Sequence, residues 1–337
     1  MRNETRIAFD AWLNRLATLN HVQLAAVISK FTADPSVQQT MENKIQESSE
    51  FLKSINLFGV REQEGEKIGL GIGGPIASTT DTKNKERQPK SVAELDNNKY
   101  RCEQTNYDTY VTYAQLDQWA KFPDFQVRLT NMILQAIALS RITIGFNGTS
   151  RAATSDPAAN PLLQDVGIGW LQKLRTKAPQ RRLFETDAGS GELKVGVSAE
   201  YKNLDAVVFD LVNNMVDPWH QEDTKLVAIC GRKLLADKYF PLVNTSQAPT
   251  EQLAADLIIS QKRIGNLPAV RVPFFPPNAI LVTRLDNLSL YYQEGAQRRS
   301  VIDNPARDRI DTFQSSNDAY ELEDYGCAAL AENITLV

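Results

Sequence analysis

The sequence predicts an α+β fold, and three features of the 337-residue chain indicate it. Residues 124–145 keep apolar side chains at helical spacing, which predicts one long, mostly buried helix. Residues 262–292 place β-branched and apolar residues in short runs between turn residues, which predicts a strand meander. Between these two segments, helical and extended patterns alternate, as in a mixed domain.

The remaining elements follow from local pattern. Within the meander, strands are expected at 269–275, 279–285 and 288–292, because Pro276 and Pro277 force a turn. Upstream we expect helices at 162–177, 204–215 and 232–239, a hairpin at 183–197 and a buried strand at 226–230. The tail from 301 to 337 is expected to form long strands.

The N-terminal 30 residues form a separable unit by pattern. Phe9, Leu13 and Leu16 stand at helical spacing in a helix expected to end near residue 20, and a second short helix is expected at 22–29. Asp34 as a cap, with Pro35 at the first helical position, then starts a new helix that runs toward residue 55.

Residues 56–101 are rich in glycine, and residues 78–89 are almost entirely polar. Such a stretch buries little apolar surface by itself. Two extended flanks, at 67–72 and 100–113, predict the arms of a long hairpin with a polar, mobile tip. Loops of this length are usually functional or disordered.

Composition excludes several classes of protein. A formal net charge of −4 argues against a protein whose affinity comes from a basic face on phosphates. Cys102, Cys230 and Cys327 lack the spacing of a disulfide framework or a zinc site and are expected as buried thiols. No apolar leader or membrane-spanning run is apparent, so no membrane partner is expected.

Two motifs invite an enzymatic reading. Residues 69–74 match GxGxxG, but Pro75 follows at once and no helix is expected to present its N-terminus to a phosphate. His220 lies among the acids Asp217 and Asp223, where a polar turn is favoured over a metal site. The sequence thus predicts no catalytic, cofactor-binding or metal-binding residues and no enzyme.

Several long strings resemble one family, the major capsid protein precursors of P2-like contractile-tailed phages. They are residues 2–6 with Phe9, 31–32 with 35–37, 65–69, 77–82, 86–89, 145–148, 160–166 with 169–173, 234–241 and 262–299. Departures fall at 83–85, at 186–199 and at a short C-terminus, where loops tolerate change.

The resemblance implies a Hong Kong 97-like capsid fold and a division of the chain. It implies an N-terminal assembly segment at 1–31, an N-arm at 32–57, an extended loop at 58–102, a peripheral domain at 103–202 with 293–337, and an axial domain at 203–292. A removable first segment implies a cut in the link at Lys30, Phe31 and Thr32, which we expect to be exposed. A permanent contact helix is the alternative.

The resemblance also implies function. The expected protein is a major capsid protein that forms pentamers and hexamers of an icosahedral procapsid and encloses double-stranded DNA without sequence-specific contacts. Its expected partners are an internal scaffolding protein, a maturation protease and a portal protein, with assembly in the bacterial cytoplasm and final location in the virion. A nanocompartment shell of the same fold is the first alternative, and a nucleotide-binding enzyme is the second.

The loop carries the expected contacts between subunits, through Ile68, Leu70, Ile72 and Ile76 across a neighbouring subunit. Some members of the fold cross-link lysine to asparagine. Lys67, Lys83, Lys85 and Lys90 lie on the right loop, but a polar, flexible setting is expected for them, so no cross-link is predicted.

Overall fold

The computed structural model describes residues 1–67, 77–89, 99–119, 125–236, 238 and 263–337, and its chain forms two compact units. Unit 1 consists of Met1–Gly65, Arg101–Gly169 and Ser289–Tyr320. Unit 2 consists of Glu66–Tyr100, Trp170–Leu288 and Glu321–Val337. Because each unit combines segments that are distant in sequence, neither corresponds to one continuous stretch of the chain.

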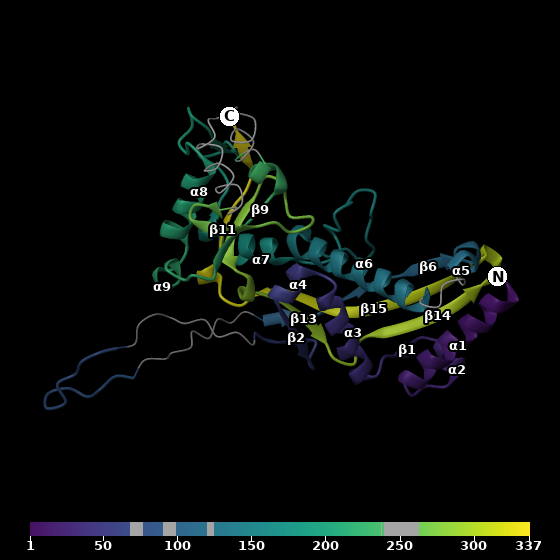
Figure 1. Ribbon diagram of the computed structural model, residues 1–337. Coiled ribbons are helices and arrows are strands. Elements are labelled where there is room, and N and C mark those ends of the chain that lie inside the picture. Colours follow the sequence, from purple (N-terminus) through teal and green to yellow (C-terminus); the bar gives the residue numbers. More distant parts are fainter. Residues whose placement is uncertain (68–76, 90–98, 120–124, 237, 239–262) are drawn as a thin grey trace, which may run out of the picture. The chain divides into compact units, whose positions relative to one another are not determined.

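Unit 1 is a helix-covered sheet (Figure 1). Its helices are α1 (Asn3–Leu19), α2 (Leu24–Ile28), α3 (Pro35–Glu47), α4 (Glu50–Ser54), α5 (Tyr113–Trp119) and α6 (Phe125–Asn147). Its strands are β1 (Phe31–Thr32), β2 (Asn56–Val60), β5 (Glu103–Asn106), β6 (Thr109–Thr112), β13 (Leu288–Gln293), β14 (Arg298–Asn304) and β15 (Arg309–Leu322). The sheet order is β1-β14-β15-β13-β2, and β5 and β6 also pair with β15.

The predicted long helix is confirmed as α6, which runs beside β15 in Figure 1. Its C-terminal half is buried, with Ile142 completely inaccessible, whereas Val127 and Met132 in its N-terminal half are 60% and 57% exposed. Among the described residues, Val127–Asn147 is also the one stretch long and apolar enough to cross a membrane. The C-terminal half of α6 is buried inside unit 1 and carries the charged side chain of Arg141, so we interpret α6 as a core helix of a folded unit.

Two glycines close the C-terminal end of α6. Gly169 N–H donates to the carbonyl of Gly148 at 3.0 Å, so the loop between them returns to the helix end. A Cβ at Gly169 would lie 2.3 Å from the carbonyl oxygen of Ile144, too close for any other residue. This approach also explains why the helix expected at 162–177 begins only at α7 (Trp170–Lys177), after Leu163 at φ 58°.

The predicted start of α3 is confirmed. Asp34 accepts a hydrogen bond from Ser36 N–H at 2.9 Å, and Pro35 occupies the first turn. The expected continuation to residue 55 is wrong, because Ser49 takes an extended backbone (φ −136°) and separates α3 from α4.

Unit 2 contains a six-stranded sheet in the order β10-β11-β9-β12-β16-β7. Its strands are β7 (Arg182–Leu183), β9 (Leu226–Cys230), β10 (Arg263–Ile264), β11 (Leu267–Val270), β12 (Ile280–Arg284) and β16 (Ala329–Ala331). A second ladder joins β8 (Leu193–Val195) to β17 (Ile334–Leu336). Helical segments include α7, α8 (Leu204–Asp210), the π-helix η2 (Leu211–Met215) and α9 (Pro218–Gln221). Residues 232–236 are helical as well, within the helix expected at 232–239. Short 3-10 turns lie at Pro179–Arg181, Leu285–Asn287 and Tyr325–Cys327, and unit 1 has another at Pro305–Arg307.

Three strand pairings expected from the sequence are wrong. The 269–292 strands form no meander, because β11 and β12 both pair with β9, whereas β13 lies parallel to β2 in the sheet of unit 1. The hairpin at 183–197 does not form either: β7 pairs with β16, and β8 pairs with β17. Residues 103–112, expected in the loop's second arm, pair with β15 instead. At the base of that loop, β3 (Glu64–Glu66) and β4 (Lys99–Arg101) do pair.

Candidate assembly surfaces

A buried charge cluster, which we call the clasp, joins three elements of unit 1. It consists of Glu42 on α3, Arg141 on α6 and Asp318 on β15, with side chains at most 1% exposed. Arg141 Nη2 lies 3.0 Å from Glu42 Oε1 and 3.1 Å from Asp318 Oδ1, while its Nε donates to Asp318 Oδ2 at 3.1 Å. One guanidinium therefore holds α3, α6 and β15 together.

Neutral groups complete the clasp. The Tyr107 hydroxyl donates to Asp318 at 2.8 Å, and the Ser316 hydroxyl lies 2.9 Å from the same carboxylate. Burial raises the pKa of Glu42, repulsion from Asp318 adds to this, and attraction to Arg141 opposes it. Burial likewise raises the pKa of Tyr107, so its hydroxyl stays protonated and can donate.

The raised pKa of Glu42 predicts that the stability of unit 1 depends on pH. Because the pKa of Glu42 is raised in the folded chain, its contribution to stability is complete below its unfolded pKa and is lost as pH rises through its folded pKa. Urea unfolding of Glu42→Gln should therefore show a smaller loss of stability between mildly acidic and neutral pH than the original chain shows. Identical pH profiles would contradict the prediction.

Part of one face of the unit 1 sheet, around Phe313, is exposed in the single chain. Tyr110, Ile302 and Phe313 project from paired positions on this face and are 59%, 36% and 43% exposed. Arg309 stacks on Tyr110, its guanidinium carbon 4.5 Å from the ring centre. An apolar group of this kind on a flat strand surface is typical of a contact between protein chains.

The N-terminal segment covers the opposite face of the same strands. Leu16 on α1 and Val27 on α2 belong to one buried cluster with Val301 and Ile310 of the sheet. The predicted helix and its apolar stripe are thus confirmed, and the stripe packs on β14 and β15.

The link that follows this segment is less exposed than expected. Lys30 is exposed, but Phe31 is 8% exposed, and Phe31 and Thr32 pair with Arg299 and Arg298 of β14. The expectation of an exposed, unpaired link is therefore wrong for Phe31, which is buried and paired. Thr32 is exposed as expected, but it is paired with β14. A cut at Lys30, Phe31 or Thr32 remains a prediction.

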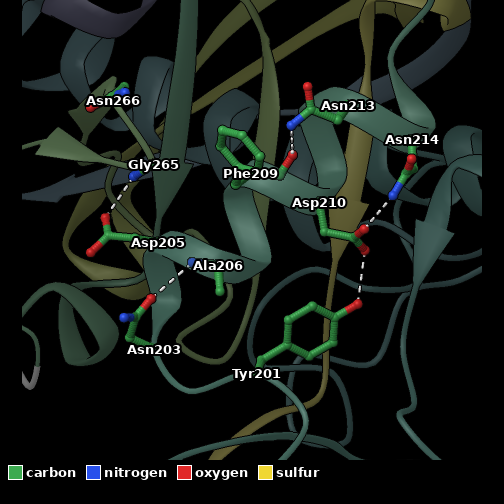
Figure 2. Close-up of a pocket in the computed structure, with 10 residues that line it drawn as sticks. All are labelled: Tyr201, Asn203, Asp205, Ala206, Phe209, Asp210, Asn213, Asn214, Gly265 and Asn266. Carbon is green, nitrogen blue, oxygen red and sulfur yellow. Dashed lines mark hydrogen bonds between the residues drawn. The ribbon is translucent and has the colours of Figure 1, made fainter.

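Unit 2 carries a hollow of about 650 Å³ between α8, η2 and the turn that joins β10 to β11 (Figure 2). Asn203 caps α8 through Ala206 N–H at 2.9 Å, and Asp205 accepts from Gly265 N–H at 2.6 Å. Figure 2 also shows Asp210 between two donors. They are the Tyr201 hydroxyl at 2.8 Å and the Asn214 amide at 2.5 Å.

Within this hollow the carboxylates already have protein donors, which leaves little polar capacity for a small ligand. Burial and the Asp210 hydrogen bond raise the pKa of Tyr201, which keeps its hydroxyl protonated as a donor. Beside these groups, the Phe209 side chain is 63% exposed. A shallow hollow with a free aromatic ring at its edge suits contact with another protein surface better than catalysis.

Comparison with known proteins shows the family of the chain. The chain matches the family "Phage major capsid protein, P2 family" over residues 8–334. It is 52% identical to the capsid protein of Escherichia phage P2 over 99% of this chain and 95% of that protein. The chain belongs to the P2 family of phage major capsid proteins.

Two further relatives support this assignment. The major capsid protein of Serratia phage KSP20 is 43% identical over 99% of this chain and 98% of its own length. A chain of the satellite phage P4 procapsid, solved with its size determination protein, superposes with a TM-score of 0.84 at 50% identity, covering 100% and 99% of the two chains. The fold is the Hong Kong 97-like fold of phage capsids, and this capsid protein is a component of the virion.

The acidic side chains near His220, which could have formed a metal site, each have a different partner in this capsid protein. His220 Nε2 lies 3.0 Å from Asp324, while Asp217 pairs with Arg181 and Asp223 pairs with Arg284. The described residues contain no group of three potential metal ligands. The GxGxxG run at 69–74 lies outside the described residues.

The predicted intersubunit residues Ile68, Leu70, Ile72 and Ile76 also lie outside the described part of the chain, as does Lys90. Lys67 is not in the polar, flexible setting expected for it. Its ammonium donates to the Leu322 carbonyl at 2.6 Å and lies 4.2 Å from the centre of the Tyr325 ring. Lys83 and Lys85 are exposed, as expected.

Sequence reasoning did not single out the clasp. One signal was present: Arg141 falls within the apolar pattern of the long helix, between Ile137 and Ile144. A charged side chain on a buried stripe requires a partner of opposite charge. The identity of that partner could not be read from the sequence, because Glu42 and Asp318 lie 99 and 177 residues away.

Proposed function

We propose that this capsid protein assembles into the pentamers and hexamers of an icosahedral procapsid, which then encloses double-stranded DNA without reading its sequence. The observation that carries the proposal is the match along the whole chain to a procapsid subunit. The net charge of −4 is consistent with a shell that surrounds DNA without wrapping it tightly. Assembly takes place in the bacterial cytoplasm, and the protein has no enzymatic activity of its own.

In this proposal an internal scaffolding protein sets the curvature of the shell, a maturation protease cuts the capsid protein and a portal protein occupies one vertex. Residues 203–292 act as the axial domain and residues 103–202 with 293–337 as the peripheral domain. Residues 1–31 are the assembly segment, 32–57 the arm and 58–102 the extended loop. The exposed Phe209 and the open face at Phe313 are the surfaces offered for contacts between copies.

Electron microscopy tests the proposed assembly. The chain expressed with the scaffolding protein of its own phage should form closed shells of uniform diameter. In packaged particles stained for double-stranded DNA, the same chain should form the shell around the DNA. Open sheets, or shells that enclose a protein cargo in place of DNA, would contradict the proposal and favour a nanocompartment.

Mass spectrometry of mature particles tests the proposed processing. The mature chain should begin within residues 31–33, because the link at Lys30 is the exposed connection between the segment and the arm. Since Phe31 and Thr32 are paired in a strand, cutting should require local opening of β1 and should be slow on the isolated chain. An intact Met1 in mature particles would show that the segment is a permanent contact helix.

A further inference from the structure

The N-terminal segment binds unit 1 through groups that a cut at the link would leave intact. The buried cluster under α1 has members on both sides of that link. Phe9, Leu16, Ala17 and Val27 precede the link, while Phe31 lies within it and Leu116, Val301 and Ile310 follow it, and all are at most 8% exposed. Separating the two sets would return both apolar surfaces to water, which opposes dissociation.

Polar contacts fix the direction of α1 on this surface. Arg6 Nη1 lies 2.6 Å from Asp303 Oδ2, and the Tyr113 hydroxyl bonds to the same carboxylate. One turn earlier, Arg2 N–H donates to Asp117 at 2.9 Å. The acceptors belong to β14 and α5, so they would remain on the shell side of a cut. Charged contacts at one end of an apolar stripe give the helix a single register.

The Trp12 ring covers the buried guanidinium of Arg299. The guanidinium carbon of Arg299 on β14 lies 5.7 Å from the centre of the Trp12 ring, and Arg299 Nε is buried without a hydrogen-bond acceptor in the described part of the chain. Burial lowers the pKa of Arg299 to about 10. Removing Trp12 would open this cationic position at the centre of an apolar surface.

The start of the link contributes little to this binding. Ser29 and Lys30 are exposed, and beside the link Asp34 N–H donates to Asn20 Oδ1 at 3.2 Å. The covalent tether mainly raises the local concentration of the segment near its site. The specific contacts lie in α1 and α2.

We propose that residues 1–29 are a self-contained ligand of the face formed by α5, β6, β14 and β15, and that they remain bound there after the chain is cut. The inference rests on the processing proposed above. Cutting alone then leaves this face covered. The face is bared only when unit 1 changes shape and loses its fit to α1.

A protease site inserted between Ser29 and Lys30 of the full chain tests the proposal, because the protein folds before it is cut. After complete cutting at micromolar concentration, size-exclusion chromatography and mass spectrometry should find fragment 1–29 in the same fraction as residues 30–337. The fragments of Leu16→Asp and Trp12→Ala should elute free. Arg15→Ala, on the exposed side of the same helix, should behave as the original chain does.

Two results would overturn the proposal. One is release of the original fragment as complete as that of the Leu16→Asp fragment, and the other is retention of the Leu16→Asp fragment as firm as that of the original. Because Leu16→Asp could disturb folding, Arg6→Ala gives a second readout: its cut fragment should exchange several-fold faster with labelled peptide 1–29 than the original does. An unchanged exchange rate would also count against the proposal. Normal shells from the uncut chain would show that the proposed assembly stands regardless.

Discussion

Replacing Arg141 by methionine should destabilise unit 1 by about 3–5 kcal/mol, because it leaves two buried carboxylates without their cation. Glu42 and Asp318 are inaccessible to water, so they would have to take up a proton or pull α3 and β15 apart. Urea unfolding of the unassembled chain, followed by tryptophan fluorescence, should show the loss as a lower midpoint with a similar slope.

A control on the same helix and a combined variant separate charge from packing. Arg128→Met changes an exposed arginine of α6 and should shift stability by less than about 0.5 kcal/mol. Adding Glu42→Gln and Asp318→Asn to Arg141→Met removes the uncompensated charges and should recover a large part of the loss. If Arg141→Met alone were as stable as the original chain, the clasp would not hold α3 in place.

Deleting residues 66–92 should abolish closed shells while leaving the subunit folded. Within this range, residues 77–89 are almost entirely exposed, and the side-chain bonds of Asp81 to described residues are local, from Lys83 N–H at 3.0 Å and from the Asn84 amide at 2.7 Å. Residues 77–89 bury little apolar surface within the described part of the chain, so they are free to bind a neighbouring chain. Circular dichroism should show melting close to that of the original, and electron microscopy should show no shells.

Shortening a different exposed loop provides the matched control. Residues 187–191 form a turn closed by Glu185, which accepts from Gly189 N–H at 3.0 Å and Gly191 N–H at 3.1 Å. Replacing this loop by two glycines should leave shell formation unchanged. Normal shells from the 66–92 deletion would contradict the role proposed for the long loop.

Local chemistry predicted the helices well. The cap at Asp34, the stripe through Phe9 and Leu16, and the apolar period of α6 each depend on residues within one or two turns. The breaks at Ser49 and Leu163 were missed, because each depends on a single backbone conformation that either residue adopts only in its tertiary setting.

Strand partners could not be predicted in the same way. The extended sequence at 280–284 would be the same whether it paired with the preceding strand or with β9. Alternation of side chains along a strand indicates only which face is buried, not which strand is the partner. The partner depends on contacts between residues distant in sequence. The same limit hid the partners of Arg141 and the pairing of Phe31 and Thr32 with β14.

The parallel pairing of β2 with β13 has a consequence for synthesis of the chain. Asn56 meets Ser289, 233 residues later, so the sheet of unit 1 cannot close until nearly the whole polypeptide has left the ribosome. A prematurely terminated chain would lack β13, β14 and β15, and with them both the seat of α1 and the open face at Phe313. The order of translation thus acts as a check on length, because only chains that extend through β15 acquire these two surfaces of unit 1.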